Sequence, residues 1–189
     1  MFAEAGQPGE VYELELELRL LADIGLIGLP NAGKSTLLSM LTAAQPKIAS
    51  YAFTTLEPNL GVMRHKGKSK VIADIPGLIE GASEGKGLGT QFLRHITRTK
   101  VVVHLVSAEP AEAREVWDNY KVVVAELEKY GMGLSAKKEL VVLNKIDLIE
   151  KKKAEEIRKY FLKKKIDVIM LSCGNGEGIE TLKNKLIES

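Results

Sequence analysis

A glycine-containing segment near the N-terminus has the residue types and spacing that bind a phosphate chain. It reads Gly28-Leu29-Pro30-Asn31-Ala32-Gly33-Lys34-Ser35, is followed by Thr36, and matches the complete P-loop pattern. The two glycines let backbone N–H groups approach phosphate oxygens, and the N-terminus of a following helix adds positive charge. We expect Lys34 to reach the β- and γ-phosphates and the Ser35 hydroxyl to bind Mg²⁺, with Thr36 completing the loop. The segment therefore predicts a nucleoside triphosphate site.

A second polar segment, Asn144-Lys145-Ile146-Asp147, follows an apolar strand, at the end where α/β folds bind ligands. The Asp147 carboxylate only accepts hydrogen bonds, and guanine presents two neighbouring donors where adenine presents an acceptor. The Lys145 stem can lie on the base, and the Asn144 amide can either serve the base edge or tie this segment to the phosphate loop. The predicted ligand is therefore GTP or GDP.

Two further segments are candidates for contacts around this nucleotide. Asp74-Ile75-Pro76-Gly77 ends a strand, and we expect Asp74 to hold a Mg²⁺-bound water and the Gly77 N–H to bond the γ-phosphate. Phe53-Thr54-Thr55 lies in a candidate switch; Thr55 is the preferred ligand for Mg²⁺ and the γ-phosphate, and Thr54 is the alternative. Two threonines before a strand are also common in any β-structure.

The segment Ser172-Cys173-Gly174 ends the last predicted strand. Its backbone amides are candidates to bind the guanine carbonyl oxygen, and a plain strand-to-helix loop is the alternative. The Cys173 side chain is expected to be a small buried group, as free cysteines usually are.

Apolar runs and helical periodicity place these segments in an α/β fold. We predict strands over residues 13–20, 24–27, 60–64, 70–74, 101–107, 140–144 and 168–171, and helices from residue 34 and over residues 91–97, 111–129, 152–164 and 179–187. Continuous apolar strands indicate a mostly parallel sheet buried on both faces by helices, which is the three-layer architecture of P-loop proteins. Residues 1–20 are interpreted as a linker and the remnant of a preceding domain, and residues 21–189 as the nucleotide-binding domain.

The overall composition is that of an ordinary globular protein of 189 residues, with 45% hydrophobic and 28% charged residues. A net charge of +2 gives little reason to expect nucleic-acid binding, and no DNA partner is predicted. Two lysine triplets, 151–153 and 163–165, are most simply the solvated face of a helix, and RNA contact by these triplets is the weakest of the alternative functions. The single cysteine and the lack of an apolar run of roughly 18 to 20 residues suit a cytoplasmic protein. The three histidines, His65, His95 and His104, have no metal-ligand spacing.

The sequence closely resembles the Obg family of P-loop GTPases. The residues that carry the resemblance are 28–35, 51–61, 74–82, 84–89, 91–96 and 144–147. The resemblance implies a cytoplasmic GTPase that acts at the large ribosomal subunit and in stress or growth control, with guanosine tetraphosphate as a possible further ligand. Obg-like proteins usually carry a glycine-rich N-terminal domain and often a small C-terminal one, so we expect this chain to be an excised, monomeric GTPase domain.

One departure from common GTPases concerns the rate of hydrolysis. Many GTPases have a glutamine after the Asp-x-x-Gly motif that orients the attacking water, and this chain has Leu78. We therefore expect slow hydrolysis, on the order of 10⁻⁴ to 10⁻² s⁻¹. Asn31 matches the position at which related GTPases bind K⁺, which predicts stimulation by K⁺, although an asparagine can simply stabilise a loop. A nucleotide-gated binding module with negligible hydrolysis is the alternative function.

Overall fold

The computed structural model describes residues 22–42, 47–48, 59–74, 99–109, 112–129 and 137–189 of the chain. These residues form a seven-stranded sheet in the order β2-β3-β4-β1-β5-β6-β7. The strands are β1 (Ile24–Ile27), β2 (Lys47–Ile48), β3 (Asn59–His65), β4 (Lys68–Asp74), β5 (Val101–Ser107), β6 (Lys138–Asn144) and β7 (Val168–Met170). The helices are α1 (Lys34–Leu41), α3 (Ala113–Lys129), α4 (Lys151–Lys163) and α5 (Ile179–Glu188), with a 3-10 turn at Ile146–Leu148.

The sheet is mostly parallel, as its apolar strands predict. Strands β4, β1, β5, β6 and β7 are parallel, whereas β2 and β3 add to one edge in antiparallel pairs. All four residues of β1 are buried, as are the first six of β5, because both strands lie inside the sheet and between helices. The carboxyl ends of β1, β4 and β6 therefore lie at one edge of the sheet.

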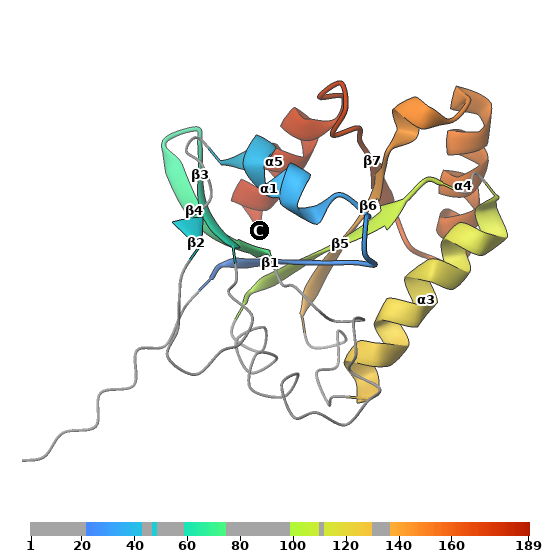
Figure 1. Cartoon of the computed structure of the whole chain (residues 1–189), viewed down its shortest axis with the longest axis horizontal. Helices are drawn as coiled ribbons and strands as arrows, with labels where there is room; N and C mark the ends of the chain where they lie inside the picture. The colour runs from blue at the N-terminus through green and yellow to red at the C-terminus, as the bar shows by residue number, and fades with distance from the viewer. Residues whose placement is uncertain (1–21, 43–46, 49–58, 75–98, 110–111, 130–136) are drawn as a thin grey trace, which may run out of the picture.

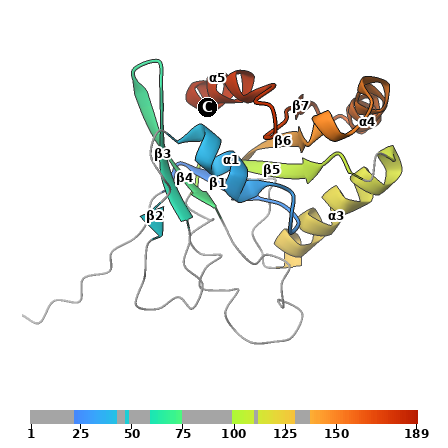
Figure 2. The ribbon, with the colours of Figure 1, turned by 45° about the horizontal axis from the view of Figure 1, so that its top comes forward.

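Two hydrophobic cores cover the two faces of the sheet. One core joins α1 and α5 to side chains such as Leu26 and Val142. The other joins α3 and α4 to side chains such as Val141 and Leu143. Since neighbouring strand residues point to opposite faces, the alternation of Val141, Val142 and Leu143 between the cores confirms the three-layer arrangement. Figures 1 and 2 show α1 and α5 on one side of the strands and α3 on the other.

The predicted elements that fall on described residues are confirmed with shifts of one or two residues at their ends. The two-residue strand β2 was missed, because so short an edge strand has no periodicity to detect. The predicted strand 13–20 and helix 91–97, and the interpretation of residues 1–20 as a linker, lie outside the described residues. No helix in the described ranges is long and apolar enough to cross a membrane.

Candidate functional site

The phosphate loop turns tightly between β1 and α1, at the positions that the sequence predicts. Gly28 has φ 148° and Gly33 has φ 98°, values that side chains other than glycine rarely adopt. A Cβ atom at Gly28 would overlap the carbonyl oxygen of Leu105, and one at Gly33 would overlap the side-chain amide of Asn144. Both glycines are therefore required because the loop lies directly against the ends of β5 and β6.

Lys34 folds back over the loop that precedes it. Its Nζ donates hydrogen bonds to the carbonyl oxygens of Gly28, at 3.0 Å, and Leu29, at 3.3 Å. The ammonium group is thereby held over the loop backbone, beside the N-terminus of α1. A lysine in this position presents a positive point charge to an anion that the loop binds.

Ser35 and Asp74 meet, although 39 residues separate them in sequence. The Ser35 hydroxyl donates a hydrogen bond of 2.6 Å to Asp74 Oδ2, joining the start of α1 to the end of β4. Asp74 is only 3% exposed, and its Oδ1 has no hydrogen-bond partner among the described residues. A buried carboxylate oxygen without a partner is costly, and a hard cation or its bound water would satisfy it. These oxygen donors fit Mg²⁺, while the third predicted ligand, Thr55, lies outside the described residues.

Asn144 ties the phosphate loop to the candidate base-binding segments. The side chain is 1% exposed, and its Nδ2 donates to the carbonyl oxygen of Ala32 at 2.7 Å. Its Oδ1 accepts the backbone N–H of Cys173 at 3.1 Å. Of the two roles that the sequence left open for Asn144, the structure shows the tie between loops.

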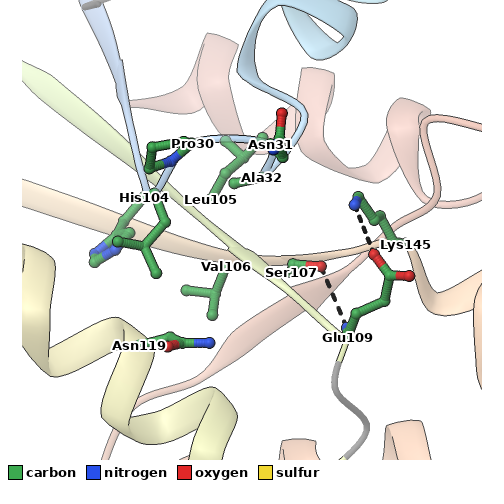
Figure 3. A pocket seen from close by; sticks show the side chains of 11 residues that line it. Pro30, Asn31, Ala32, His104, Leu105, Val106, Ser107, Glu109, Asn119 and Lys145 are labelled. Carbon is green, nitrogen blue, oxygen red and sulfur yellow. Dashed lines mark hydrogen bonds and ion pairs between the residues drawn. The ribbon is translucent and has the colours of Figure 1, made fainter. Parts of the chain in front are cut away.

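Lys145 adopts a left-handed backbone conformation, with φ 65°, directly after β6. Its Nζ lies 2.6 Å from Glu109 Oε2, in an ion pair that the sequence did not predict. Figure 3 shows this pair at the rim of a cavity of about 210 Å³, across from Pro30 and Asn31 of the phosphate loop. The ion pair holds the Lys145 side chain close to the loop, where its stem can cover a base.

Asp147 is an exposed residue of the 3-10 turn after Lys145, and its carboxylate lies beside Gly174. A Cβ atom at Gly174 would come within 2.9 Å of Asp147 Oδ2, so the missing side chain leaves room beside the carboxylate. The amides of Gly174 and Asn175 donate to the Ser172 hydroxyl, at 3.0 and 3.1 Å. Because the Cys173 amide also has an internal partner, Asn144, the binding of a guanine carbonyl by these amides stays a prediction.

The Cys173 side chain is half-buried and packs against the core that contains α1 and α5. Burial raises the pKa of its thiol to about 11, and the nearby Asp147 charge acts in the same direction. The hydrogen bond with Asn144 opposes this shift. The thiol is therefore protonated at neutral pH, which agrees with a packing role rather than a reactive one.

A buried polar cluster beneath the phosphate loop escaped sequence analysis. His104 on β5 is buried, its Nδ1 lies 3.0 Å from Glu139 Oε1, and its ring stacks on Tyr120 of α3 at 4.8 Å. The Tyr120 hydroxyl donates to Glu139 Oε2 at 3.1 Å, and burial together with that carboxylate raises the tyrosine pKa. The cluster fastens α3 to the strands that carry the site. Only the three-dimensional pairing of β5 with β6 brings these residues together.

Several predicted site residues lie outside the described residues, and their roles stay predictions. They are Phe53, Thr54, Thr55, Ile75, Pro76 and Gly77, together with Leu78. Among the residues that the structure does describe, no group of three or more His, Cys, Asp or Glu residues is arranged to hold a metal ion.

Solved structures share this fold. The G domain of the T. maritima FeoB iron transporter matches with a TM-score of 0.63 and 24% identity, over 89% of this chain and 98% of that one. A variant of Aquifex aeolicus Era bound to GDP and AlF₄⁻ matches with a TM-score of 0.66 and 22% identity, over 89% of this chain and 56% of that one. At this level of identity the likeness establishes the fold.

Sequence comparison narrows the family. The family described as 50S ribosome-binding GTPase matches residues 23–145. GTPase Obg of Endomicrobium trichonymphae is 50% identical over 186 residues, which cover 98% of this chain and 44% of that protein. GTPase Obg of Chlorobaculum tepidum is also 50% identical over 186 residues, covering 98% of this chain and 53% of the relative. The chain thus spans about half the length of these relatives. It belongs to the family of 50S ribosome-binding GTPases and, within that family, to the Obg GTPases.

Proposed function

We propose that this chain binds guanine nucleotide with Mg²⁺ and slowly hydrolyses GTP to GDP. The observation that carries the proposal is the tie made by Asn144 between the phosphate loop and the segment 172–174. Its two hydrogen bonds connect the phosphate-binding loop to the residues that are suited to bind a base. Family membership supports the same activity.

The residues divide between three tasks in this proposal. The backbone of residues 28–36, with Lys34, binds the phosphates. Ser35 and Asp74, with Thr55, hold Mg²⁺, which neutralises charge that develops on the phosphate oxygens. Asn144, Lys145 and Asp147 bind the base, with help from the amides of Ser172, Cys173 and Gly174.

Catalysis in this proposal rests on Asn31, Lys34, Thr55 and Gly77. Asn31 has φ 61° and lines the cavity shown in Figure 3. Its amide oxygen suits a monovalent cation such as K⁺, which would supply positive charge at the phosphates in a chain whose Leu78 cannot orient the attacking water. A loop-stabilising role for Asn31 is the competing explanation, since asparagine tolerates left-handed conformations.

The partner proposed for the chain is the large ribosomal subunit, in the cytoplasm. The support is that the chain belongs to the family of 50S ribosome-binding GTPases and is similar in sequence to GTPase Obg proteins. A role in stress or growth control, as a monomer, belongs to the same proposal. The alternative is a binding module that senses guanine nucleotides, guanosine tetraphosphate included, with negligible hydrolysis.

The deciding experiment measures multiple-turnover GTP hydrolysis in K⁺ and in Na⁺ at matched ionic strength. We expect turnover above that of a Lys34→Ala control, faster in K⁺, with the K⁺ effect lost in Asn31→Ala. Equal rates in both salts, above the control, would support the GTPase activity but contradict the proposed K⁺ site. Tight GDP binding with no turnover above the control would instead establish the binding module.

A further inference from the structure

The turn between β3 and β4 carries a dense run of positive charge. Residues 64–70 read Arg-His-Lys-Gly-Lys-Ser-Lys, with four Lys or Arg side chains and no acid, while the whole chain has a net charge of only +2. Lys66 and Gly67 have φ values of 49° and 73°. Two positive φ values identify the tight two-residue hairpin turn that matches the twist of its strands. The charges are therefore concentrated on one well-defined hairpin.

This hairpin has a fixed position on the molecule. His65 Nε2 lies 2.9 Å from Asn184 Oδ1 and 3.5 Å from Glu180 Oε1, so α5 anchors the tip. The exposed residues Arg64, Lys66 and Lys68 stand around a hollow of about 460 Å³. Figure 1 shows the hairpin at one edge of the ribbon, beside α5.

The hairpin charges are not neutralised by the protein. In the described part of the chain, neither Arg64 nor Lys66, Lys68 or Lys70 forms an ion pair, and Glu180 of α5 contacts His65 instead. The lysine triplet 151–153 differs, because Lys153 lies 4.0 Å from Glu112, and Glu150, Glu155 and Glu156 flank or share its helix. The hairpin therefore offers several uncompensated cations on one turn.

We infer that the β3–β4 hairpin binds the phosphate backbone of RNA. Arg64, Lys66 and Lys68 supply the charges that bind phosphate oxygens. Residues 64–69 contain no aliphatic side chain, tyrosine, phenylalanine or tryptophan, so the tip has nothing to insert into a lipid layer. Contacts between these cations and phosphate oxygens carry no base-sequence information. The choice of RNA over an anionic membrane rests on the proposed function, in which the partner is the large ribosomal subunit.

The hairpin lies away from the nucleotide site. Its turn adjoins Lys68 at the start of β4, whereas Asp74 ends that strand, about 20 Å further along at the usual rise per strand residue. RNA on the hairpin therefore leaves the phosphate loop accessible. Substitutions at the tip should change RNA affinity without changing nucleotide affinity.

The test compares two variants of the 189-residue chain that lose the same charge. R64Q/K66Q/K68Q removes the hairpin cations, and K151Q/K152Q/K153Q is the matched control on α4. Binding to large-subunit ribosomal RNA and to a short RNA duplex is followed by fluorescence anisotropy over a range of salt. Three phosphate contacts contribute about 2.7 to the slope of log affinity against log salt, or about 40-fold in affinity between roughly 50 and 200 mM salt. We expect the hairpin variant to lose this contribution and the control to keep it.

Three results would overturn the inference: no RNA binding by the unaltered chain, an equal loss in the two variants, or hairpin-dependent binding to phosphatidylserine vesicles that exceeds RNA binding. GDP affinity, measured on every variant, confirms folding. Loss of RNA binding with GTP turnover intact supports the hairpin inference separately from the proposed enzyme. If RNA binding depends on the hairpin but the chain shows no GTP turnover, the proposed enzymatic activity is contradicted and the proposed RNA-binding surface is supported.

Discussion

Replacing Asn144 by alanine tests whether one side chain joins the two halves of the nucleotide site. The change removes hydrogen bonds to the carbonyl oxygen of Ala32 and the amide of Cys173. Ala32 is 2% exposed, so water cannot easily replace the lost donor. An unsatisfied buried polar group costs about 1 to 3 kcal/mol, so two such groups predict a loss of about 2 to 6 kcal/mol in the free energy of unfolding. That is a large share of a typical domain's stability of about 5 to 15 kcal/mol.

Urea unfolding without nucleotide measures this loss, and Asn175→Ala is the matched control. The Asn175 side chain accepts one hydrogen bond, from the amide of Glu177, and is exposed, so its removal should cost less than about 1 kcal/mol. GDP affinity should fall in the Asn144 variant and stay unchanged in the control. Equal unfolding free energies for the two variants would refute the reasoning that Asn144 ties the loops together.

Three further changes test other parts of the site. Asp147→Asn should shift the binding preference from GDP to xanthosine diphosphate, on the order of 100-fold or more, because the amide matches the hydrogen-bonding edge of xanthine. An unchanged preference in competition binding would contradict the assignment of Asp147 to the base. Ser35→Ala should reduce the gain in GTP affinity on adding Mg²⁺ by about tenfold, since a ligand oxygen is lost; titrations with and without Mg²⁺ measure this, and an undiminished gain argues against the metal site. Alkylation of Cys173 by iodoacetamide should be slow at neutral pH, and its rate should rise towards pH 11, because only the thiolate reacts and the pKa of this thiol is raised to about 11. A rate that levels off near pH 8.5, about the pKa of an ordinary thiol, would contradict the buried environment.

Local pattern predicted most of the described fold and much of the site. The buried runs in β1, β5 and β6 indicated parallel strands, and the segments 28–36 and 144–147 indicated the ligand, because each motif needs only neighbouring residues. The hairpin between β3 and β4 had its own signal, a Lys66-Gly67 turn between two strands, which sequence analysis did not use.

Other features depend on residues that meet only in the folded chain. Glu109 is an exposed residue after β5, and nothing near it in sequence indicates that Lys145 will form an ion pair with it. The contact of Ser35 with Asp74 was expected only through a shared ion, and the direct hydrogen bond of 2.6 Å emerges from the fold. The cluster of His104, Glu139 and Tyr120 likewise depends on the pairing of β5 with β6 and on the packing of α3.

The double attachment of Asn144 has a consequence for redesigning the choice of base. A substitution there releases the phosphate loop at the same time, so any relaxed specificity would be accompanied by weaker binding of every nucleotide. Asp147 is exposed and lies beyond that attachment, in the turn after it. An orthogonal version of this protein, responsive to a nucleotide that cells lack, is therefore best sought at Asp147, with Asn144 left in place.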